Sequence, residues 1–381
     1  MSKKHILEFA SFAGMGGTQR MLLEFLRKAS REKYVFYLCV LLNHDILNEE
    51  ASKSGIENTS LNMRGYWDLA AWWKLYCFAK NKRIDLIRTY GLKAHIIGRI
   101  VGKWLNIPVN ITSVRNTDPW RKWYHTLLDR LTSGWTDLYI SNSEAGRVAT
   151  HRRERIPLSK IITIPNGIDL SDYEPYNTNA HQINVEYRQQ FDIAPHAPIL
   201  GTIANLREQK GHKTIVDAFL LIQEKISDVK CLFVGDDLLG GEIHRYIQDR
   251  QLEHAFILTG LRQDIPQLLT MFDAFILPSL WEGIPRAILE AMAMKKPVVT
   301  TAVGGIPEVV EPGRTGVFIP PNDPQILADT LVSLLNDPKR LSDMGQAGYE
   351  RIQQFFSLDA VVASTENVYD CLMGGRPFRG E

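Results

Sequence analysis

The chain has 381 residues, 45% of them hydrophobic, so it is long enough for two domains, each with its own core. Its longest apolar runs have the length of a strand, its four cysteines show no metal or redox spacing, and a cytoplasmic protein is expected. The net charge of +1 divides unevenly, because residues 1–170 carry 26 Lys and Arg against 15 Asp and Glu, whereas the remainder carries 18 against 28.

Short apolar runs alternate with helical stretches along the first half of the chain. The predicted strands are HILEFASF (5–12), VFYLCVLL (35–42), IDLIRTYG (84–91), VNITSVR (109–115) and TDLYISNS (136–143). A glycine-rich turn after the first strand leads to a helix that is predicted to begin at about Thr18. β-Branched runs of this length suit parallel strands that are buried on both faces.

The second half repeats this alternation. Its predicted strands are APILGTIANL (197–206), VKCLFVGDD (229–237), AFILTGL (255–261), DAFILPS (273–279) and KPVVTTAVGG (296–305). A segment rich in Pro, Asn and Gly at 162–175 separates the halves and is the predicted linker. The expected fold class is α/β, with two doubly wound Rossmann-like domains, 1–170 and 171–355, facing a central cleft.

Ligands of doubly wound sheets bind outside the carboxyl ends of the strands, so the loops at these ends are candidate sites. The first such loop contains Gly14, Gly16 and Gly17, which let the backbone approach a ligand closely at a helix start. A plain tight turn is the alternative. The loop after 197–206 carries Arg207 and Lys210, two cations that can neutralise a diphosphate. Solvated surface charges are the alternative there.

The loop after 273–279 places two carboxylates, Glu282 and Glu290, around the start of an apolar helix. Pro285 fits the first turn of this helix, where a missing amide donor costs nothing. Backbone amides at the helix start are expected to point toward an anion, and they belong to Gly283, Ile284 and Arg286. Carboxylates do not hold an anion but accept hydrogen bonds from hydroxyls, so the combination suits a nucleotide sugar.

The segment EGIPRAILEAMAMKKPVVTTAVGGIPEVV (282–310) resembles the signature of the retaining glycosyltransferases of family 4, which have the GT-B fold. The resemblance runs over most of the chain. Its further motifs are GGTQR near the start, PNGID at the domain junction, KGH, VGDD, LTGLRQDIP and GRTGVFIPPNDP. The resemblance also implies that the last segment, 356–381, forms a helix that crosses back to the first domain.

The resemblance implies a role for each of these motifs. Glu282 would contact the donor sugar, Glu290 the ribose hydroxyls, and Lys210 the diphosphate. The other implied donor contacts are Gly16 and Gly17 beside the phosphate, Gly304 and Gly305 near the sugar, and the loop at Leu261 and Arg262 against the base.

The chain departs from the family pattern at two positions. Asn205 stands where the family often has an arginine, and Arg207 is the candidate for the missing cation. Arg115 stands where many members have a histidine, and it is expected to contact the acceptor or a phosphate. With Arg207 in this role, the expected catalytic residues are Glu282, Arg207 and Lys210.

The implied reaction transfers a hexose, with retention, from a UDP- or GDP-sugar to a hydroxyl of a glycan or glycolipid in surface polysaccharide or lipopolysaccharide assembly. No cofactor and no metal is expected, since cations and a helix start can stabilise the departing diphosphate. A nucleotide-sugar isomerase of the same fold and a non-catalytic nucleotide-sugar-binding partner protein are the alternatives. Dependence on an acceptor separates the transferase from the isomerase, and donor hydrolysis separates the enzymes from the binder.

Seven of the eight tryptophans precede residue 136. They concentrate in WDLAAWWKLYCFAKNKR (67–83) and DPWRKWYHTLLDR (118–130), which mix aromatic and basic side chains. Leu69, Trp73, Tyr76 and Lys80 share one helical stripe. Both segments could contact the inner face of a membrane and reach a lipid-linked acceptor, which the basic balance of this half favours. Core packing with a solvated face is the alternative for the first segment, and an acceptor groove for the second.

Overall fold

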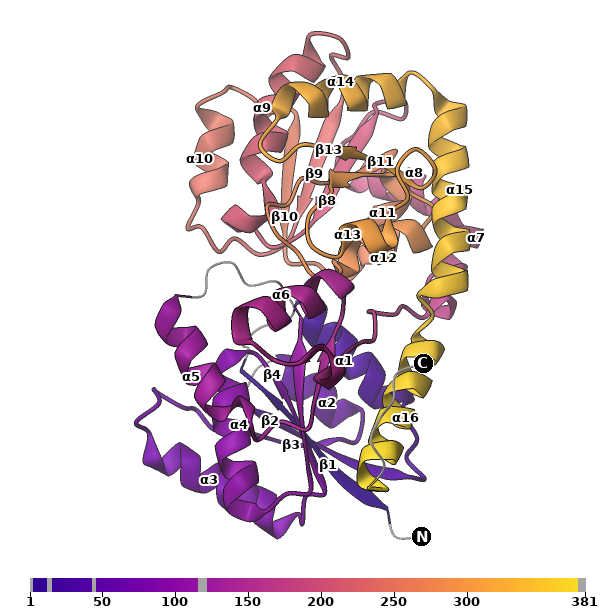
Figure 1. The fold of residues 1–381 in the computed structure, drawn as a ribbon. Coiled ribbons are helices and arrows are strands. Elements are labelled where there is room, and N and C mark those ends of the chain that lie inside the picture. Colours follow the sequence, from indigo (N-terminus) through magenta and orange to yellow (C-terminus); the bar gives the residue numbers. More distant parts are fainter. Residues whose placement is uncertain (1–2, 12–15, 43–45, 116–121, 376–381) are drawn as a thin grey trace. The chain divides into compact units, whose positions relative to one another are not determined.

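The computed structural model describes residues 3–11, 16–42, 46–115 and 122–375. It contains two compact units (Figure 1). Unit 1 comprises Met1–Gly167 and Leu358–Glu381, and unit 2 comprises Ile168–Ser357. Each unit is a parallel sheet with helices on both faces, which confirms the predicted pair of doubly wound α/β domains. The units divide three residues before the boundary predicted after Leu170.

The sheet of unit 1 has seven strands in the order β3-β2-β1-β4-β5-β6-β7. The strands are β1 (Lys4–Ala10), β2 (Tyr34–Val40), β3 (Glu57–Ser60), β4 (Leu86–Tyr90), β5 (Val109–Val114), β6 (Leu138–Ser141) and β7 (Ile161–Thr163). All pairs are parallel, with Ile6 opposite both Phe36 and Leu86. The chain therefore reverses its direction of winding between β1 and β4, which lie side by side.

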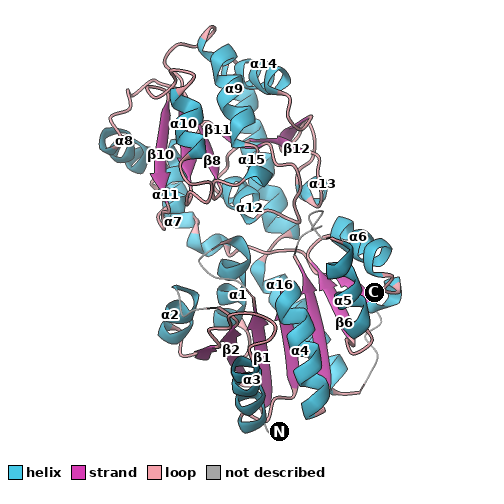
Figure 2. Ribbon diagram, turned by 90° about the vertical axis from the view of Figure 1, so that its left-hand side faces the viewer, coloured by secondary structure: helices cyan, strands magenta, loops and turns pink. Residues whose placement is uncertain are grey.

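Helices cover both faces of this sheet (Figure 2). They are α1 (Gly17–Lys28), α2 (Ile46–Lys53), α3 (Leu69–Asn81), α4 (Leu92–Leu105), α5 (Trp123–Ser133), α6 (Glu144–Glu154) and α16 (Leu358–Met373). Successive residues of β1 point to opposite faces, so Ile6 packs in the core under α1, α2 and α16, and Leu7 packs in the core under α3 and α4. Helix α5 lies against α4 and α6, in the layer that contains α3 and α4. None of the described helices is both long and apolar enough to cross a bilayer.

Unit 2 has six parallel strands in the order β10-β9-β8-β11-β12-β13. They are β8 (Ile199–Ile203), β9 (Lys230–Val234), β10 (Phe256–Gly260), β11 (Ala274–Leu277), β12 (Val298–Thr301) and β13 (Gly316–Ile319). Its helices are α7 (Glu174–Thr178), α8 (Ala180–Gln190), α9 (His212–Gln223), α10 (Glu242–Gln248), α11 (Ile265–Met271), α12 (Arg286–Ala293), α13 (Ile306–Val309), α14 (Pro324–Leu335) and α15 (Pro338–Phe355). Ile199 and Leu200 face opposite helix layers, so this sheet too is buried on both sides.

Three strands do not coincide with any predicted strand: β3, β7 and β13. Strand β3 reads ENTS and gains its place from pairing with β2, with Glu57 opposite Tyr37. Strand β7 has three residues and overlaps the predicted linker, and β13 (GVFI) follows a turn at 311–315. Such short segments form strands because a neighbouring strand offers hydrogen bonds, which a single sequence does not reveal.

A buried polar network attaches α16 to the sheet of unit 1. The Tyr369 hydroxyl donates to Glu8 Oε1 at 2.9 Å and accepts from Arg88 Nη1 at 3.0 Å. Arg88 Nε also donates to Ser113 Oγ at 2.7 Å. Glu8 and Tyr369 are fully buried, and burial raises the pKa of the Glu8 carboxyl above its ordinary value. The hydroxyl of Tyr369 therefore links the Glu8 carboxyl and the Arg88 guanidinium inside the sheet to α16.

We expect Tyr369→Phe to loosen α16, because the substitution removes one hydrogen bond from Glu8 and one from Arg88 inside the core. A buried polar group left without its partner costs about 1–3 kcal/mol. Hydrogen–deuterium exchange over 358–373 should become faster by the factor that corresponds to this loss of free energy. Tyr246→Phe is the control, since this tyrosine bonds the half-buried Asp217 of unit 2. Equal exchange in both variants would show that the network does not hold α16.

Candidate functional site

The strand order of unit 2 identifies where a ligand is expected. Strands β8 and β11 are adjacent, and the chain winds outward from them in opposite directions, so their carboxyl ends form the switch point of the sheet. The loops after these strands are hydrogen-bonded to each other. Leu280 N donates to Gln209 O at 2.8 Å, and Gln209 Nε2 donates to Trp281 O at 2.6 Å. These contacts bring 207–211 and 278–285 together.

Glu282 and Lys210 form an ion pair across these two loops. Lys210 Nζ lies 2.5 Å from Glu282 Oε1, which also accepts a hydrogen bond from Ser279 Oγ at 2.8 Å. The Glu282 side chain is 7% exposed and that of Lys210 is 20% exposed, so solvent screens the pair only weakly. Two of the three residues expected to be catalytic therefore lie in direct contact, with Ser279 as a partner that the sequence analysis missed.

A third loop, after β12, closes against the backbone of Glu282. Gly304 has a φ of +57°, and a Cβ at this position would lie 1.9 Å from the carbonyl oxygen of Glu282. Gly305 N donates to Gly283 O at 3.0 Å, and Thr301 Oγ1 donates to Ser279 O at 2.6 Å. Only glycine fits the position of residue 304, because both the dihedral angle and the available space exclude a side chain.

Helix α12, which follows the loop after β11, begins at Arg286, with Pro285 as its N-cap rather than in its first turn as predicted. The Arg286 side chain turns along its own helix, and its Nε donates to Glu290 Oε1 at 2.8 Å. Tyr173 Oη lies 3.4 Å from Glu290 Oε1 and 3.5 Å from Arg286 Nη2. All three side chains are buried. The second carboxylate of the motif is thus held in a network of its own.

Arg207, the second cation expected at the diphosphate, and Asn205 differ in their surroundings. Arg207 is exposed, and within the described part of the chain its guanidinium forms no hydrogen bond or ion pair with another side chain. Asn205, at the position where the family often has an arginine, accepts a hydrogen bond from Asp236 N at 3.1 Å and so links the loops after β8 and β9. Arg207 is available to a ligand, whereas Asn205 has a structural contact.

His212, at the start of α9, is a further residue that the sequence analysis did not single out. It is 2% exposed, and its ring lies edge-on to Phe233 with 4.9 Å between the ring centroids. Burial, aided by the nearby charge of Lys210, lowers the pKa of His212 to about 4. This histidine is therefore neutral at physiological pH and packs against Phe233.

The loop expected to contact the base lies farther along the sheet. Leu261 is 44% exposed, directly after β10, and β9 separates β10 from β8. Arg262 bonds Asp264, with its Nε 2.8 Å from Oδ1, and Asp264 also accepts from the Tyr187 hydroxyl at 2.8 Å. The Leu261 side chain is accessible to a ligand, whereas the Arg262 guanidinium is engaged in a local salt bridge.

In unit 1 the predicted residues lie at the carboxyl edge of the other sheet. Gly16 is the N-cap of α1 and Gly17 its first residue; Gly14 lies outside the described residues. Arg115 follows β5, and its Nη1 lies 3.2 Å from Asn166 Oδ1 and 3.5 Å from the sulfur of Met21, on α1. Burial lowers the pKa of Arg115 to about 10, so the guanidinium remains charged at neutral pH. Arg115 and α1 are thus brought together.

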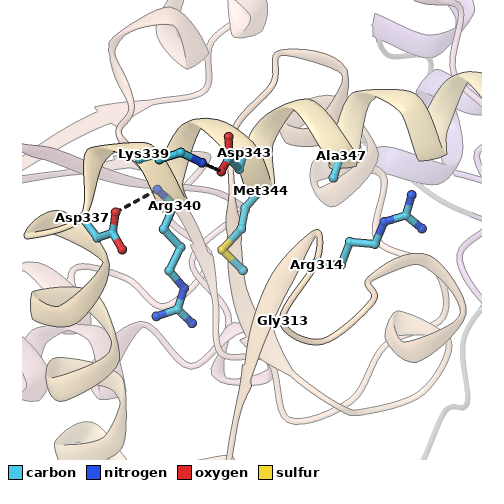
Figure 3. Close-up of a pocket in the computed structure, with 8 residues that line it drawn as sticks. All are labelled: Gly313, Arg314, Asp337, Lys339, Arg340, Asp343, Met344 and Ala347. Carbon is cyan, nitrogen blue, oxygen red and sulfur yellow. Dashed lines mark hydrogen bonds and ion pairs between the residues drawn. The ribbon is translucent and has the colours of Figure 1, made fainter.

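A cavity of about 400 Å³ elsewhere in unit 2 contains none of the predicted site residues (Figure 3). It is lined by Gly313, Arg314, Asp337, Lys339, Arg340, Asp343, Met344 and Ala347. Two of its cations are already paired, because Arg314 lies 2.9 Å from Glu311 and Lys339 lies 2.6 Å from Asp343.

Across the described residues, no three His, Cys, Asp or Glu side chains are grouped so as to hold a metal ion.

Two glycosyltransferase family models together match most of the chain. The family "Glycosyltransferase Family 4" matches residues 15–172, and "Glycosyl transferases group 1" matches residues 184–351. The Escherichia coli UDP-Gal:alpha-D-GlcNAc-diphosphoundecaprenol alpha-1,3-galactosyltransferase is 24% identical over 93% of this chain and 94% of its own length. The Bacillus anthracis N-acetyl-alpha-D-glucosaminyl L-malate synthase is 27% identical over 80% and 79%.

The fold is shared with a solved structure that contains ligands. Anabaena Alr3699/HepE in complex with UDP and glucose matches with a TM-score of 0.85 at 22% identity, over 96% of this chain and 99% of that one. The same protein was also solved with UDP-glucose and matches with a TM-score of 0.83.

We expect Gly304→Ala to destabilise unit 2 more than Gly313→Ala. Both glycines have a positive φ, which costs about 1–2 kcal/mol for any other residue, but a Cβ on Gly313 would meet no atom within 4 Å. The alanine at 304 must in addition displace the backbone of Glu282. The measurement is the midpoint of thermal unfolding of each variant, and equal shifts would show that the close approach to Glu282 does not matter.

Proposed function

This chain belongs to glycosyltransferase family 4 and has the GT-B fold, and we propose that it is a retaining hexosyltransferase. In this proposal it moves a hexose from a nucleotide-diphosphate sugar to a hydroxyl of a glycan or glycolipid acceptor, in the assembly of a surface polysaccharide or lipopolysaccharide. The acceptor is lipid-linked, which locates the reaction at the cytoplasmic face of a membrane. Neither a metal ion nor a cofactor takes part.

The proposal rests on the Lys210–Glu282 ion pair at the switch point between β8 and β11. A diphosphate sugar presents both an anion and hydroxyl donors, so it can replace each member of the pair with a better partner. The ammonium of Lys210 then contacts the diphosphate, and Glu282 accepts hydrogen bonds from sugar hydroxyls. Ser279 stays bonded to Glu282 and keeps its orientation.

The reaction itself needs no protein nucleophile. The acceptor hydroxyl attacks the anomeric carbon on the face that the diphosphate leaves, so a C–O bond to the acceptor forms as the bond to the phosphate oxygen breaks. The electron pair leaves with the diphosphate, which also takes the hydroxyl proton. Lys210 and Arg207, with the amides of Gly283 and Arg286, stabilise the negative charge that develops on the leaving group.

The second carboxylate, Glu290, would bind the ribose of the nucleotide. Its Oε1 is already oriented by Arg286 and approached by Tyr173, so one carboxylate oxygen is fixed before a ligand arrives. A carboxylate fixed in this way accepts from two vicinal hydroxyls with little loss of conformational entropy. The exposed Leu261 and its backbone border the base.

Uridine is the proposed nucleotide of the donor. One relative is named as a UDP-galactose transferase, and the structural relative Alr3699/HepE holds UDP or UDP-glucose. The proposed lipid-linked acceptor is based on the Escherichia coli galactosyltransferase, whose name specifies a sugar on diphosphoundecaprenol. Arg115, charged and close to α1, is the proposed acceptor-side or phosphate contact.

A thermal-shift screen against uridine, guanosine, adenosine and thymidine diphosphates and their sugar conjugates tests the proposal directly. A ligand that binds only the native state raises the unfolding midpoint by mass action, so UDP and one UDP-hexose should raise it most. The shift should persist in EDTA. No shift with any nucleotide would contradict the proposed donor site.

We expect Lys210→Ala to weaken UDP binding about 10- to 150-fold, which is the effect of losing one hydrogen bond to a charged group. Arg207→Ala should also weaken binding, since its guanidinium has no competing contact. Isothermal titration calorimetry gives both values. Lys213→Ala is the matched control, because this lysine lies three residues away on α9 and pairs with Glu242 at the surface. Equal affinities in the Lys210 and Lys213 variants would refute the assignment.

Turnover with the identified UDP-sugar should require an acceptor and give a product whose anomeric configuration equals that of the donor. Proton NMR of the product reads this configuration. Donor conversion to another sugar nucleotide without acceptor would identify an isomerase, and an inverted product would exclude the retaining mechanism.

A further inference from the structure

Helix α5 presents its apolar side chains to solvent and its polar ones to the interior. Trp123, Leu127 and Leu131 follow one another at four-residue spacing and are 77%, 47% and 68% exposed. The buried residues of the same helix are Asp129 and Thr132. A helix on the surface of a globular protein normally buries its apolar face, so this orientation is the reverse of the usual one.

A buried salt bridge fixes this orientation. Arg99 of α4 is fully buried and is paired with the Asp129 carboxylate. The same guanidinium donates to Thr132 Oγ1 at 3.1 Å and to Thr112 Oγ1 at 3.0 Å. Rotating α5 to bury its leucines would expose or unpair these charges, which is costly in the interior. The outward apolar face is therefore enforced by the fold.

The neighbouring helices extend the same kind of surface. Helices α3, α4 and α5 belong to one layer on the sheet of unit 1 (Figures 1 and 2). Trp67, Trp73 and Trp104 on or beside them are 93%, 66% and 59% exposed. Core packing with a solvated face was the alternative for 67–83. Ala71, Leu75 and Ala79 form a buried face, Trp67 and Trp73 lie on the exposed side, and Trp72 is partly buried and donates to Tyr66 O at 2.9 Å.

The charges of these three helices have one sign on the outside. Their sequences contain a single acidic residue, Asp129, which is buried in the salt bridge with Arg99. The exposed basic side chains on or beside these helices are Lys74, Lys80, Arg83, Lys93, Lys103 and Lys122, whereas the acidic Asp68, beside them, caps the start of α3. Tryptophan and lysine together are typical of surfaces that contact lipid headgroups. Two copies of the same surface would repel each other, so a second chain is a poorer occupant.

We propose that the outer surface of α3, α4 and α5 rests on an anionic lipid bilayer. Trp123, Leu127 and Leu131 enter the interface between headgroups and acyl chains, and the lysines contact lipid phosphates. This inference rests on the proposed function in one respect: a lipid-linked acceptor gives the chain a reason to contact a bilayer. None of the donor-binding residues belongs to this surface.

The test is flotation of the full chain with vesicles of phosphatidylcholine alone or mixed equally with phosphatidylglycerol. The protein should float with the anionic vesicles and lose this binding in high salt. The triple variant Trp123→Gln, Leu127→Gln, Leu131→Gln should bind these vesicles at least about tenfold more weakly, because three apolar side chains no longer enter the bilayer. A matched triple variant of exposed apolar residues in unit 2, Val185→Gln, Leu220→Gln, Ile326→Gln, should bind as the unaltered chain does.

Two results would overturn the inference. Either the two triple variants bind vesicles equally, or the unaltered chain is a dimer by light scattering that the α5 variant converts to a monomer, which would identify a second copy as the occupant. UDP titration of each variant keeps this test separate from the proposed function. Normal UDP affinity without vesicle binding rejects the bilayer surface alone, whereas absent UDP binding by the unaltered chain rejects the donor site.

Discussion

The ion pair between Lys210 and Glu282 is the contact on which the candidate site depends, because it joins the loops that follow the two central strands of unit 2. A carboxylate as buried as that of Glu282 needs a counter-charge, since an isolated ion in the interior is strongly unfavourable. The Gly304 backbone packs directly on Glu282, so the position of this residue is fixed from two sides. In the proposed function, a ligand at this place exchanges partners with the pair and does not have to build the site.

Buried charges have a related role in unit 1, where each orients a helix. Arg99 and Asp129 set the rotation of α5, and Glu8 with Arg88 receives the hydroxyl of α16. For α5 the polar contact determines which face of the helix is exposed, because apolar packing alone would bury the other face. For α16 the polar contact adds to apolar packing, since Leu358, Val362 and Val368 are also buried. Specific orientation is the property that buried polar contacts add to a hydrophobic core.

Much of this arrangement could be predicted from the sequence, because β-branched strands and glycine-rich loops are local features. The contact of Lys210 with the 282 loop follows from the strand order that such a pattern implies. Tyr173 could not be predicted, since it lies in the presumed linker and reaches Glu290 117 positions away. For 118–130 the sequence offered a membrane contact or an acceptor groove but could not give the rotation of α5, because the periodicity of Trp123, Leu127 and Leu131 is the same for a buried and an exposed stripe.

The return of α16 to unit 1 has a consequence for how the chain folds as it is synthesised. Unit 2 is inserted between Gly167 and Leu358, and Ile168 N donates to Phe356 O at 2.9 Å, so its two ends are adjacent, as in a domain spliced into another. Residues 168–357 contain every strand and helix of their own core, so unit 2 needs no later part of the chain. Unit 1 begins first but is completed only after unit 2 has been synthesised, because Glu8 and Arg88 lack Tyr369 until then.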